Sequence, residues 1–343
     1  MPDTTPSPNR RPTVLVSAAA LAAPAVAMLE QAGYAVITTT GYPGQAELVA
    51  ALTEHRPVAL LHRQGFIDGT VLDAGAPELR MVARHGAGMD GIDIAAAAAR
   101  DLTVTRAAGA NSRAVAEHTW ALLLALAKDL PSIASGMAAG LWEKTSRHTR
   151  DLEGRTIGIV GYGAIGSKVA RYAEAFGMTV LAYDPLLKSD ALPGPGTRVA
   201  SLAELLPQVS ILSLHCPLDD VTRGMIDAAM LKLLPAGALV VNAARGGIVN
   251  ETDLLASLEA GHVAGAAIDV FETEPLPDAN PLRRHPHVIA TPHIAANTPN
   301  GAAAMATGAA DCIISVLAGR KPKLEGAIVS LGGKTPISAA VTA

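Results

Sequence analysis

The sequence predicts an α/β protein with two parallel sheets, each covered by helices. Over residues 13–107, short apolar runs of β type alternate with helical patterns, which is the order that βαβ units produce. A second progression of the same kind starts near residue 156 and continues to about residue 296. The length of 343 residues suggests about two domains with ample cores.

The first progression contains no glycine-rich phosphate loop, so we interpret it as a flavodoxin-like domain and not as a nucleotide-binding one. An alanine-rich helix over about 301–317 most simply returns to pack on this domain, which makes the domain discontinuous. The residues after Gly319 look like a tail. The expected strands are 14–16, 34–39, 58–61, 79–83 and 102–105, and the expected helices are 24–31, 46–55 and 94–100.

The second progression opens with the most informative stretch of the chain, residues 156–184. An expected strand at 157–160 is followed by a glycine-rich loop, a helix, and a second strand at 178–183 that ends at Asp184. A GxGxxG motif alone is a weak signal, but between a strand and a helix it is the fingerprint of a Rossmann-type dinucleotide-binding domain. The loop reads Gly161-Tyr162-Gly163-Ala164-Ile165-Gly166.

The three motif glycines have separate expected tasks. Gly161 permits the tight turn, Gly163 lets the backbone approach a pyrophosphate, and Gly166 lets the helix pack on the strand. Asp184 would accept hydrogen bonds from the ribose hydroxyls and repel a 2′-phosphate, and the following residues 185–187 contain no arginine that could bind one. The sequence therefore predicts NAD as the cofactor in preference to NADP.

These observations predict the domain boundaries. We expect a disordered, polar and proline-rich tail at 1–12, a substrate domain at 13–107 and 297–330, an NAD-binding domain at 108–296, and a second tail at 331–343.

Polar residues stand at the carboxyl ends of the expected strands of the NAD-binding domain. The expected strands are 178–183, 211–214, 239–242, 264–269 and 288–290. The polar residues at their ends are Asp184, His215, Arg245, Asp269 and His293. In an open parallel sheet, ligands bind beyond the carboxyl ends of the strands. The pattern therefore predicts a single site at this edge.

Three of the residues in this half of the chain can perform dehydrogenase chemistry on a 2-hydroxy acid. Arg245 can bind the substrate carboxylate through its planar guanidinium. His293 can exchange the hydroxyl proton near neutral pH. Glu274 can orient this histidine and favour its charged form.

A set of short motifs spans about residues 84–296. They are RHGAGMD at 84–90, ANS at 110–112 with AEH at 116–118, GYGAIG at 161–166, HCPL at 215–218, VNAARGG at 241–247, DVFETEP at 269–275 and TPHI at 291–294. In this order they resemble the motifs of the D-isomer-specific 2-hydroxyacid dehydrogenase family, which contains D-3-phosphoglycerate dehydrogenases and hydroxypyruvate/glyoxylate reductases.

The resemblance implies roles for individual residues. Arg245, Glu274 and His293 match the catalytic residues, while Glu272 does not match the dyad carboxylate. The expected substrate-binding residues are Arg84, Ala87, Gly88 and Arg245. The expected cofactor-binding residues are Gly161, Gly163, Ala164, Ile165, Gly166, Asp184, His215, Cys216, Pro217, Thr222, Ala243, Ala244, Arg245, Asp269, His293, Ala295 and Ala296.

Composition excludes several other classes of protein. The net charge is −4 with scattered basic residues, so we expect no nucleic-acid partner. Two cysteines provide no disulfide framework, and the N-terminus has no signal-peptide core, so we expect a cytoplasmic protein without a membrane partner. No metal is expected. Five further histidines are interpreted as structural or solvent-facing: His62, His118, His148, His262 and His285.

The helix expected at 112–128 presents alanine and leucine on nearly all faces, and Pro131 is expected to stop it. Since one domain cannot cover all these faces, we expect a homodimer through residues 112–150, as the resemblance also implies. The chain is expected to end before the C-terminal regulatory domain that phosphoglycerate enzymes often carry.

Two alternatives to this activity stay open. One is an NAD-sensing interaction protein like the corepressors that share this fold, and the other is a phosphite-type dehydrogenase. Formate oxidation is disfavoured because formate dehydrogenases pair the histidine with glutamine, whereas this chain has Glu274.

Overall fold

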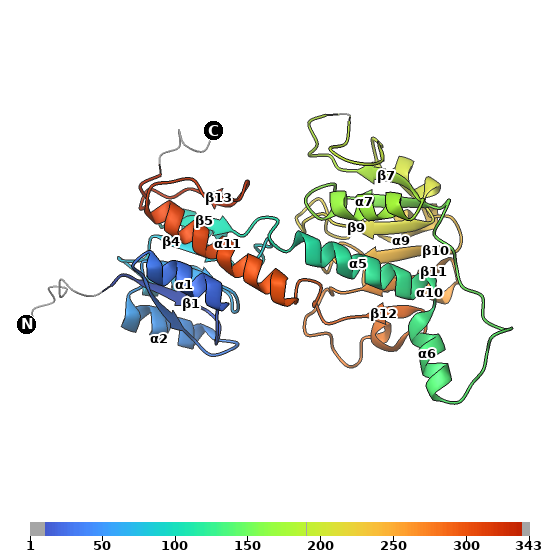
Figure 1. Ribbon diagram of the computed structural model, residues 1–343, viewed down its shortest axis with the longest axis horizontal. Helices are drawn as coiled ribbons and strands as arrows, with labels where there is room; N and C mark the ends of the chain where they lie inside the picture. The colour runs from blue at the N-terminus through green and yellow to red at the C-terminus, as the bar shows by residue number, and fades with distance from the viewer. Residues whose placement is uncertain (1–10, 190, 338–343) are drawn as a thin grey trace, which may run out of the picture. The chain divides into compact units, whose positions relative to one another are not determined.

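The computed structural model describes residues 11–189 and 191–337, so most of the expected N-terminal tail and the end of the expected C-terminal tail lie outside the described residues. The chain forms two compact units (Figure 1). Unit 1 comprises Met1–Asn111 together with Thr298–Ala343, and unit 2 comprises Ser112–Asn297. Unit 1 is therefore assembled from two separate parts of the chain.

The strands of unit 1 are β1 (Thr13–Val16), β2 (Ala35–Thr38), β3 (Ala59–His62), β4 (Met81–Arg84), β5 (Thr103–Arg106) and β13 (Ile328–Ser330). Its helices are α1 (Ala23–Gln31), α2 (Gln45–His55), α3 (Gly69–Ala74), α4 (Ile94–Ala98) and α11 (Pro299–Leu317). The sheet order is β13-β5-β4-β3-β1-β2, in which β1 to β5 are parallel and β13 joins β5 antiparallel. The parallel part has the flavodoxin order, so the expected fold class is confirmed.

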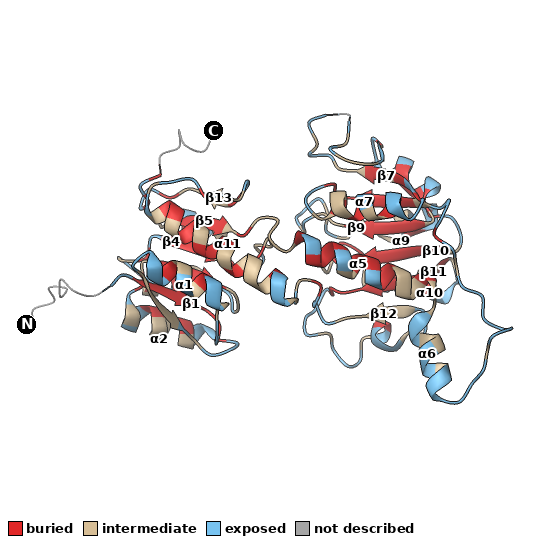
Figure 2. Cartoon of the chain, viewed as in Figure 1, coloured by how far each residue is buried: buried red, intermediate tan, exposed pale blue. Residues whose placement is uncertain are grey.

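The core of unit 1 lies on both faces of this sheet. Val14 and Val16 of β1 pack with α1 and α11, while Leu15 between them packs with α2 and α3 on the other face. Successive residues of a strand point to opposite faces, so a sheet covered on both sides needs continuous apolar strands. Figure 2 shows this as buried strands beneath helices whose outer faces are exposed.

The segment after Gly319 corrects the expectation of a tail. It contains β13, and the Oγ1 atoms of Thr103 and Thr335 lie 2.8 Å apart in the interior. Ile337 is also buried. A Cβ atom on Gly332 would lie 2.2 Å from the carbonyl oxygen of Asp101, so this segment passes directly against the loop before β5. Residues 328–337 therefore belong to unit 1.

Helix α11 is long and apolar enough to cross a membrane by length and composition, and α5 (Ser112–Ala127) with α6 (Leu130–Ala138) would count as one bent candidate. Half of the 18-residue apolar stretch of α11 is buried within the protein. Ala309, Ala310 and Ile313 of α11 have no exposed surface and pack into the core that covers β1, β3 and β4. This packing is typical of a core helix.

The strands of unit 2 are β6 (Thr156–Val160), β7 (Thr179–Tyr183), β8 (Thr197–Arg198), β9 (Ile211–Leu214), β10 (Ala238–Asn242), β11 (Val263–Ile268) and β12 (Val288–Ala290). Its other helices are α7 (Gly166–Ala175), α8 (Leu202–Leu205), α9 (Ala228–Leu233) and α10 (Glu251–Glu259), with 3₁₀ turns η1 (Leu206–Gln208) and η2 (Pro281–Arg284). All strands are parallel in the order β12-β11-β10-β9-β6-β7-β8. The order reverses between β6 and β9, as in a Rossmann fold.

Helices α5 and α6 meet at a sharp bend of 61°. Asp129 adopts a left-handed φ of 48° between them, and Pro131 stands in the first turn of α6, where a missing N–H costs nothing. The Trp120 ring of α5 stacks on Phe176 with their centroids 4.6 Å apart. This contact fastens α5 to the end of α7.

Candidate active site

Of the three motif glycines in the loop of unit 2, only Gly163 has free space beside its backbone for a ligand. A Cβ atom on Gly161 would lie 2.7 Å from the backbone N of Cys216, and one on Gly166 would lie 2.1 Å from the carbonyl oxygen of Gly161. Gly161 also has a φ of +88°. A Cβ atom on Gly163, in contrast, would meet no atom within 4 Å. Two glycines therefore close the turn, and the third leaves its backbone open to a pyrophosphate at the start of α7.

Asp184 lies at the carboxyl end of β7, beside the glycine-rich loop. Its two carboxylate oxygens accept hydrogen bonds from the backbone N–H groups of Tyr162 at 2.8 Å and Leu186 at 2.9 Å. These bonds fix the carboxylate beside the loop, where a ribose would lie in this fold.

Sequence inspection missed an arginine near this position. Arg198 of β8 donates from Nη2 to the carbonyl oxygen of Asp184 at 3.3 Å and from Nη1 to that of Ser189 at 2.8 Å. It is fourteen residues beyond Asp184 in the chain, so only the pairing of β7 with β8 reveals its proximity.

His215 follows β9, and its backbone packs against Gly161. Its Nε2 lies 2.8 Å from Oγ of Ser213, and burial lowers the pKa of His215 to about 3, so the ring is neutral. Its buried Nδ1 has no hydrogen-bond partner among the described residues. Burial raises the pKa of the neighbouring Cys216 thiol to about 11, so Cys216 is protonated at neutral pH and is not a nucleophile.

Four of the other expected cofactor residues, Ile165, Ala243, Ala295 and Ala296, belong to one small apolar cluster, which forms an apolar floor. Ala243 and Ala295 pack together with Val115 of α5, and Ile165 and Ala296 contact this cluster. Ala244 is also buried. Thr222 closes the loop after Pro217 by donating from Oγ1 to its carbonyl oxygen at 2.7 Å. Ala164 is exposed beside Gly163.

Arg245 follows β10 in a tightly packed turn. The Asn242 side chain donates to the carbonyl oxygen of Arg245 at 2.9 Å, and Arg245 Nη1 donates to the carbonyl oxygen of Ala244 at 2.6 Å. A Cβ atom on Gly246 would lie 1.8 Å from the carbonyl oxygen of Phe271. This close approach brings the Arg245 turn against the loop that carries Glu274.

Asp269 is fully buried at the end of β11 and organises the loop that carries His293. Its Oδ1 accepts from Oγ1 of Thr291 at 2.6 Å and from the N–H of Ile294 at 2.9 Å, while Oδ2 accepts from the N–H of Ala295 at 3.0 Å. His118 Nε2 of α5 lies 3.5 Å from Oδ1. The sequence predicts a cofactor role for Asp269 and none for His118, but in the structure both residues help to build this loop.

His293 and Glu274 form a hydrogen-bonded pair. Nδ1 of His293 lies 2.7 Å from Oε2 of Glu274, and Oε1 of Glu274 accepts from the N–H of Phe271 at 3.0 Å. His293 has a left-handed φ of 50°, and its N–H donates to the carbonyl oxygen of Asp269 at 2.7 Å. The backbone of the loop therefore holds the imidazole in place.

The electrostatic surroundings keep Glu274 ionised. Burial alone would raise its pKa, but the hydrogen bonds from His293 and Phe271 and the charges of His293 and Arg245 together lower the pKa below its ordinary value. Glu272, two residues earlier, instead accepts from the N–H of Glu251 in α10 at 3.1 Å. Of the two acids, only Glu274 is hydrogen-bonded to the histidine.

The expected substrate loop of unit 1 follows β4. Arg84 ends this strand, and Ala87 and Gly88 lie in the turn after it. Arg84 donates from Nε to the carbonyl oxygen of Gly88 at 3.1 Å. The arginine therefore braces the turn that contains the other two residues.

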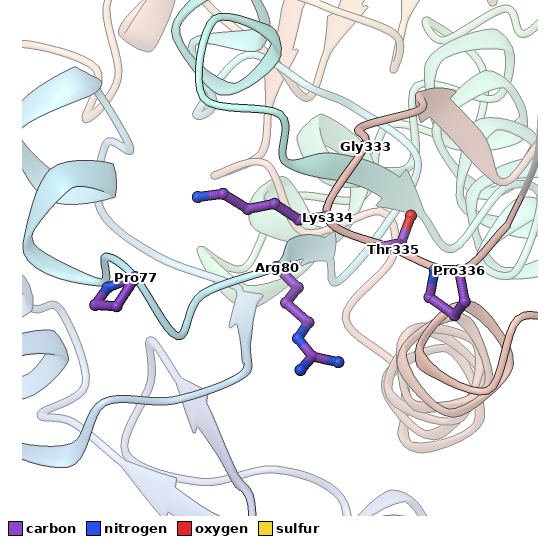
Figure 3. A pocket seen from close by; sticks show the side chains of 6 residues that line it. All are labelled: Pro77, Arg80, Gly333, Lys334, Thr335 and Pro336. Atoms are coloured by element: carbon purple, nitrogen blue, oxygen red, sulfur yellow. The ribbon is translucent and has the colours of Figure 1, made fainter.

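A surface depression of about 480 Å³ lies at the opposite edge of the unit 1 sheet, beside the start of β4. It is lined by Pro77, Arg80, Gly333, Lys334, Thr335 and Pro336 (Figure 3). The Arg80 and Lys334 side chains point in different directions, so they do not converge on one ligand. We assign it no part in the site. Within residues 11–189 and 191–337, no group of three His, Cys, Asp or Glu side chains is arranged to hold a metal ion.

Comparison with known proteins finds similar chains. Residues 120–295 match the family model of the D-isomer specific 2-hydroxyacid dehydrogenase NAD binding domain. The D-3-phosphoglycerate dehydrogenase of Mycobacterium tuberculosis is 38% identical over 277 residues, which cover 81% of this chain and 52% of that protein. The chain thus spans about half the length of the curated relatives it matches.

Solved structures match over nearly the whole chain. The TT0316 protein of Thermus thermophilus is 34% identical with a TM-score of 0.83, and the match covers 93% of this chain and 100% of that one. A formate dehydrogenase of Staphylococcus aureus, solved in complex with NAD, is 26% identical with a TM-score of 0.79, and the match covers 94% of this chain and 99% of that one.

Proposed function

The chain belongs to the D-isomer specific 2-hydroxyacid dehydrogenase family and carries its NAD binding domain, and on this basis we propose that it interconverts a small D-2-hydroxy acid and the corresponding 2-oxo acid. The observation that carries the proposal is the 2.7 Å contact between His293 and Glu274 on a loop organised by Asp269. A histidine that is held by an ionised carboxylate is suited to carry a proton.

The cofactor would bind along the carboxyl edge of the unit 2 sheet. Gly163 leaves space for the pyrophosphate, and the Asp184 carboxylate stands where ribose hydroxyls can donate to it. The apolar floor of Ala243, Ala295 and Ala296 would support the nicotinamide half. When bound, NADH supplies the hydride that reduces the carbonyl carbon of a 2-oxo acid.

The residues of the chain would perform the remaining steps. Protonated His293 donates its Nε2 proton to the carbonyl oxygen, and Glu274 stabilises the imidazolium before this transfer. Arg245 binds the substrate carboxylate and polarises the carbonyl group. In oxidation, neutral His293 accepts the hydroxyl proton. Of the unit 1 residues, we propose that the N–H groups of Ala87 and Gly88 bind carboxylate, with Arg84 at the base of the same loop.

The substrate is expected to be of the 3-phosphoglycerate, hydroxypyruvate or glyoxylate type. The similarity to phosphoglycerate dehydrogenases supports this class. We also propose that the protein acts in the cytoplasm as a homodimer, since Cys216 and Cys312 are both free thiols and the α5–α6 region exposes apolar side chains.

A steady-state assay of NADH oxidation over a panel of 2-oxo acids tests the proposed activity. The panel includes glyoxylate, hydroxypyruvate and the 2-oxo acid derived from 3-phosphoglycerate. We expect turnover with at least one of them. NADH binding without turnover on any member would contradict the proposal and favour a sensor of the cofactor.

A further inference from the structure

His62 ends β3 inside unit 1 and has only 1% of its surface exposed. Its Nε2 lies 2.9 Å from the carbonyl oxygen of Gly65, and its Nδ1 lies 3.0 Å from Nη1 of Arg84. A carbonyl oxygen can only accept a hydrogen bond and a guanidinium can only donate one. The two contacts therefore define one neutral tautomer, in which Nε2 carries the proton and Nδ1 accepts from Arg84.

Burial, followed by the charge of Arg84, lowers the pKa of His62 to about 4. The ring consequently stays neutral at physiological pH and keeps the Nδ1 lone pair available to Arg84. Protonation would place an N–H group against the guanidinium.

Arg84 connects two loops at the carboxyl edge of the unit 1 sheet. Besides the contact with His62, its Nη1 donates to the carbonyl oxygen of Arg63 at 2.7 Å, and its Nε donates to that of Gly88 at 3.1 Å. His62 and Arg84 are also direct neighbours in the pairing of β3 with β4. The guanidinium thus spans from the loop after β3 to the turn that contains Ala87 and Gly88.

The end of the loop after β4 also packs closely against His62. A Cβ atom on Gly91 would lie 2.7 Å from Cε1 of His62, so only glycine passes here without displacing the ring. Just beyond, the N–H of Ile67 donates to the carbonyl oxygen of Gly91 at 2.9 Å, and Ile67 pairs with Ile92 in an isolated bridge. The two loops are therefore held together around His62.

We propose that His62 is a positioning residue for the substrate loop, which acts by holding Arg84 against the carbonyl oxygen of Gly88. This inference rests on the proposed binding of carboxylate by the N–H groups of Ala87 and Gly88. His62 contacts no substrate itself. Its role is to fix the guanidinium, and through it the turn, in the conformation that presents those N–H groups.

Two substitutions separate the two contacts of His62. The oxygen of His62→Asn can occupy the position of Nδ1 and still accept from Arg84, but the side chain no longer reaches Gly65. The amide of His62→Gln can replace Nε2 and donate to Gly65, but it leaves Arg84 without this acceptor. His262→Gln, which removes a contact to the carbonyl oxygen of Leu231 in unit 2, is the matched control.

We expect His62→Gln to raise KM for the 2-oxo acid about tenfold, the effect of about 1.4 kcal/mol, with KM for NADH unchanged. His62→Asn and His262→Gln should keep KM for the 2-oxo acid within about twofold of wild type. The asparagine still accepts from Arg84, and His262 has no contact with this arginine. Equal effects of His62→Gln and His62→Asn on this KM, or no effect of either, would overturn the proposal.

Two measurements do not depend on turnover. Nitrogen-15 NMR of the wild-type protein should find His62 protonated at Nε2 and bare at Nδ1, and the opposite tautomer would overturn the proposal even if no variant folds. The backbone amide chemical shifts of Ala87 and Gly88 should move away from their wild-type values in His62→Gln and stay near them in His62→Asn. If the wild type turns over no 2-oxo acid, the proposed function fails, while these two measurements still decide whether His62 positions the loop.

Discussion

The imidazole of His293 and the carboxylate of Glu274 are joined at 2.7 Å, although the two residues are nineteen positions apart in the chain. His293 is held on its backbone side as well, because its N–H donates to the carbonyl oxygen of Asp269. The imidazole is thus oriented from two directions, and Nε2 is the ring nitrogen that remains for a substrate.

Replacing His293 by alanine should remove the proton carrier while the cofactor site stays intact. General acid–base catalysis contributes roughly 10²–10⁴-fold, so kcat of His293→Ala should fall by at least about 100-fold. NADH affinity, measured by fluorescence titration, should change little. A kcat close to wild type would remove His293 from the proposed role.

Replacing Glu274 by glutamine should alter the pH profile more than the maximal rate. The amide can still orient His293, but it no longer favours the charged imidazolium that the reduction step needs. The basic limb of the reduction profile should therefore move to lower pH in Glu274→Gln.

The acid side of the wild-type pH profile should reflect the protonation of Glu274. Its pKa is lowered, so the carboxylate stays ionised at neutral and mildly acidic pH and its contribution is lost only as pH falls through that lowered value. Profiles of wild type and Glu274→Gln that superimpose on the basic side would reassign Glu274 to a purely structural role.

Cofactor preference should depend on the charge of Asp184. The wild type should use NADH with a higher kcat/KM than NADPH, because the carboxylate repels a 2′-phosphate. Asp184→Ala and the isosteric Asp184→Asn should both narrow the gap, and each should raise KM for NADH by about tenfold or more as charged hydrogen bonds to the ribose are lost. Equal efficiency of the two cofactors in the wild type would refute this role.

Replacing Gly163 by alanine should affect cofactor binding, whereas replacing Gly161 by alanine should affect the stability of the fold. Gly163→Ala places its methyl group in open space, so the protein should keep the Tm of the wild type but lose NADH affinity because the pyrophosphate approach is blocked. Gly161→Ala meets the backbone of Cys216 at a positive φ and should destabilise the fold by more than about 1 kcal/mol. Thermal unfolding and NADH titration of both variants measure the two effects. Unchanged NADH affinity in Gly163→Ala would show that the cofactor does not approach this residue.

Assembly should depend on the α5–α6 region. Leu130, Met137, Leu141 and Trp142 are each more than half exposed, and Trp142 reaches 78%. Sedimentation should find a dimer at micromolar concentration, and Met137→Ser combined with Trp142→Ser should weaken it. Tyr42→Ser, which removes an aromatic side chain of unit 1 that is 84% exposed, is the control. A wild-type monomer would contradict the predicted dimer.

Local patterns in the sequence located the main elements well. The expected strands 211–214 and 288–290 have the same bounds as β9 and β12. Both could be predicted because each is a short apolar run followed directly by polar residues. Strand β13 was missed because three residues that pair antiparallel at a sheet edge have no periodic signal of their own. Its partner β5 lies more than 200 residues earlier, so only the tertiary fold reveals the pairing.

The same limit applies to single residues. The sequence predicts His62 and His118 to be structural or solvent-facing, because no neighbouring residue in the sequence suggests a function for them. Their partners lie far away in the chain: Arg84 is on the strand next to that of His62, and Asp269 follows β11 while His118 is in α5. These residues become neighbours only when the chain folds. Glu274 and His293 were matched by motif, and the 2.7 Å contact between them could be measured only in the structure.

Unit 1 is built from two separate segments of the chain, and this constrains the order in which the protein can fold during translation. Residues Ser112–Asn297 are contiguous and emerge from the ribosome together, so unit 2 can fold as soon as it is complete. The first five strands of unit 1 emerge earlier, but the face of their sheet that α11 covers stays bare, and β5 stays an open edge, until Ser330 has been synthesised. During that interval the nascent chain exposes an apolar sheet face and an unpaired strand, which are the features that chaperones bind.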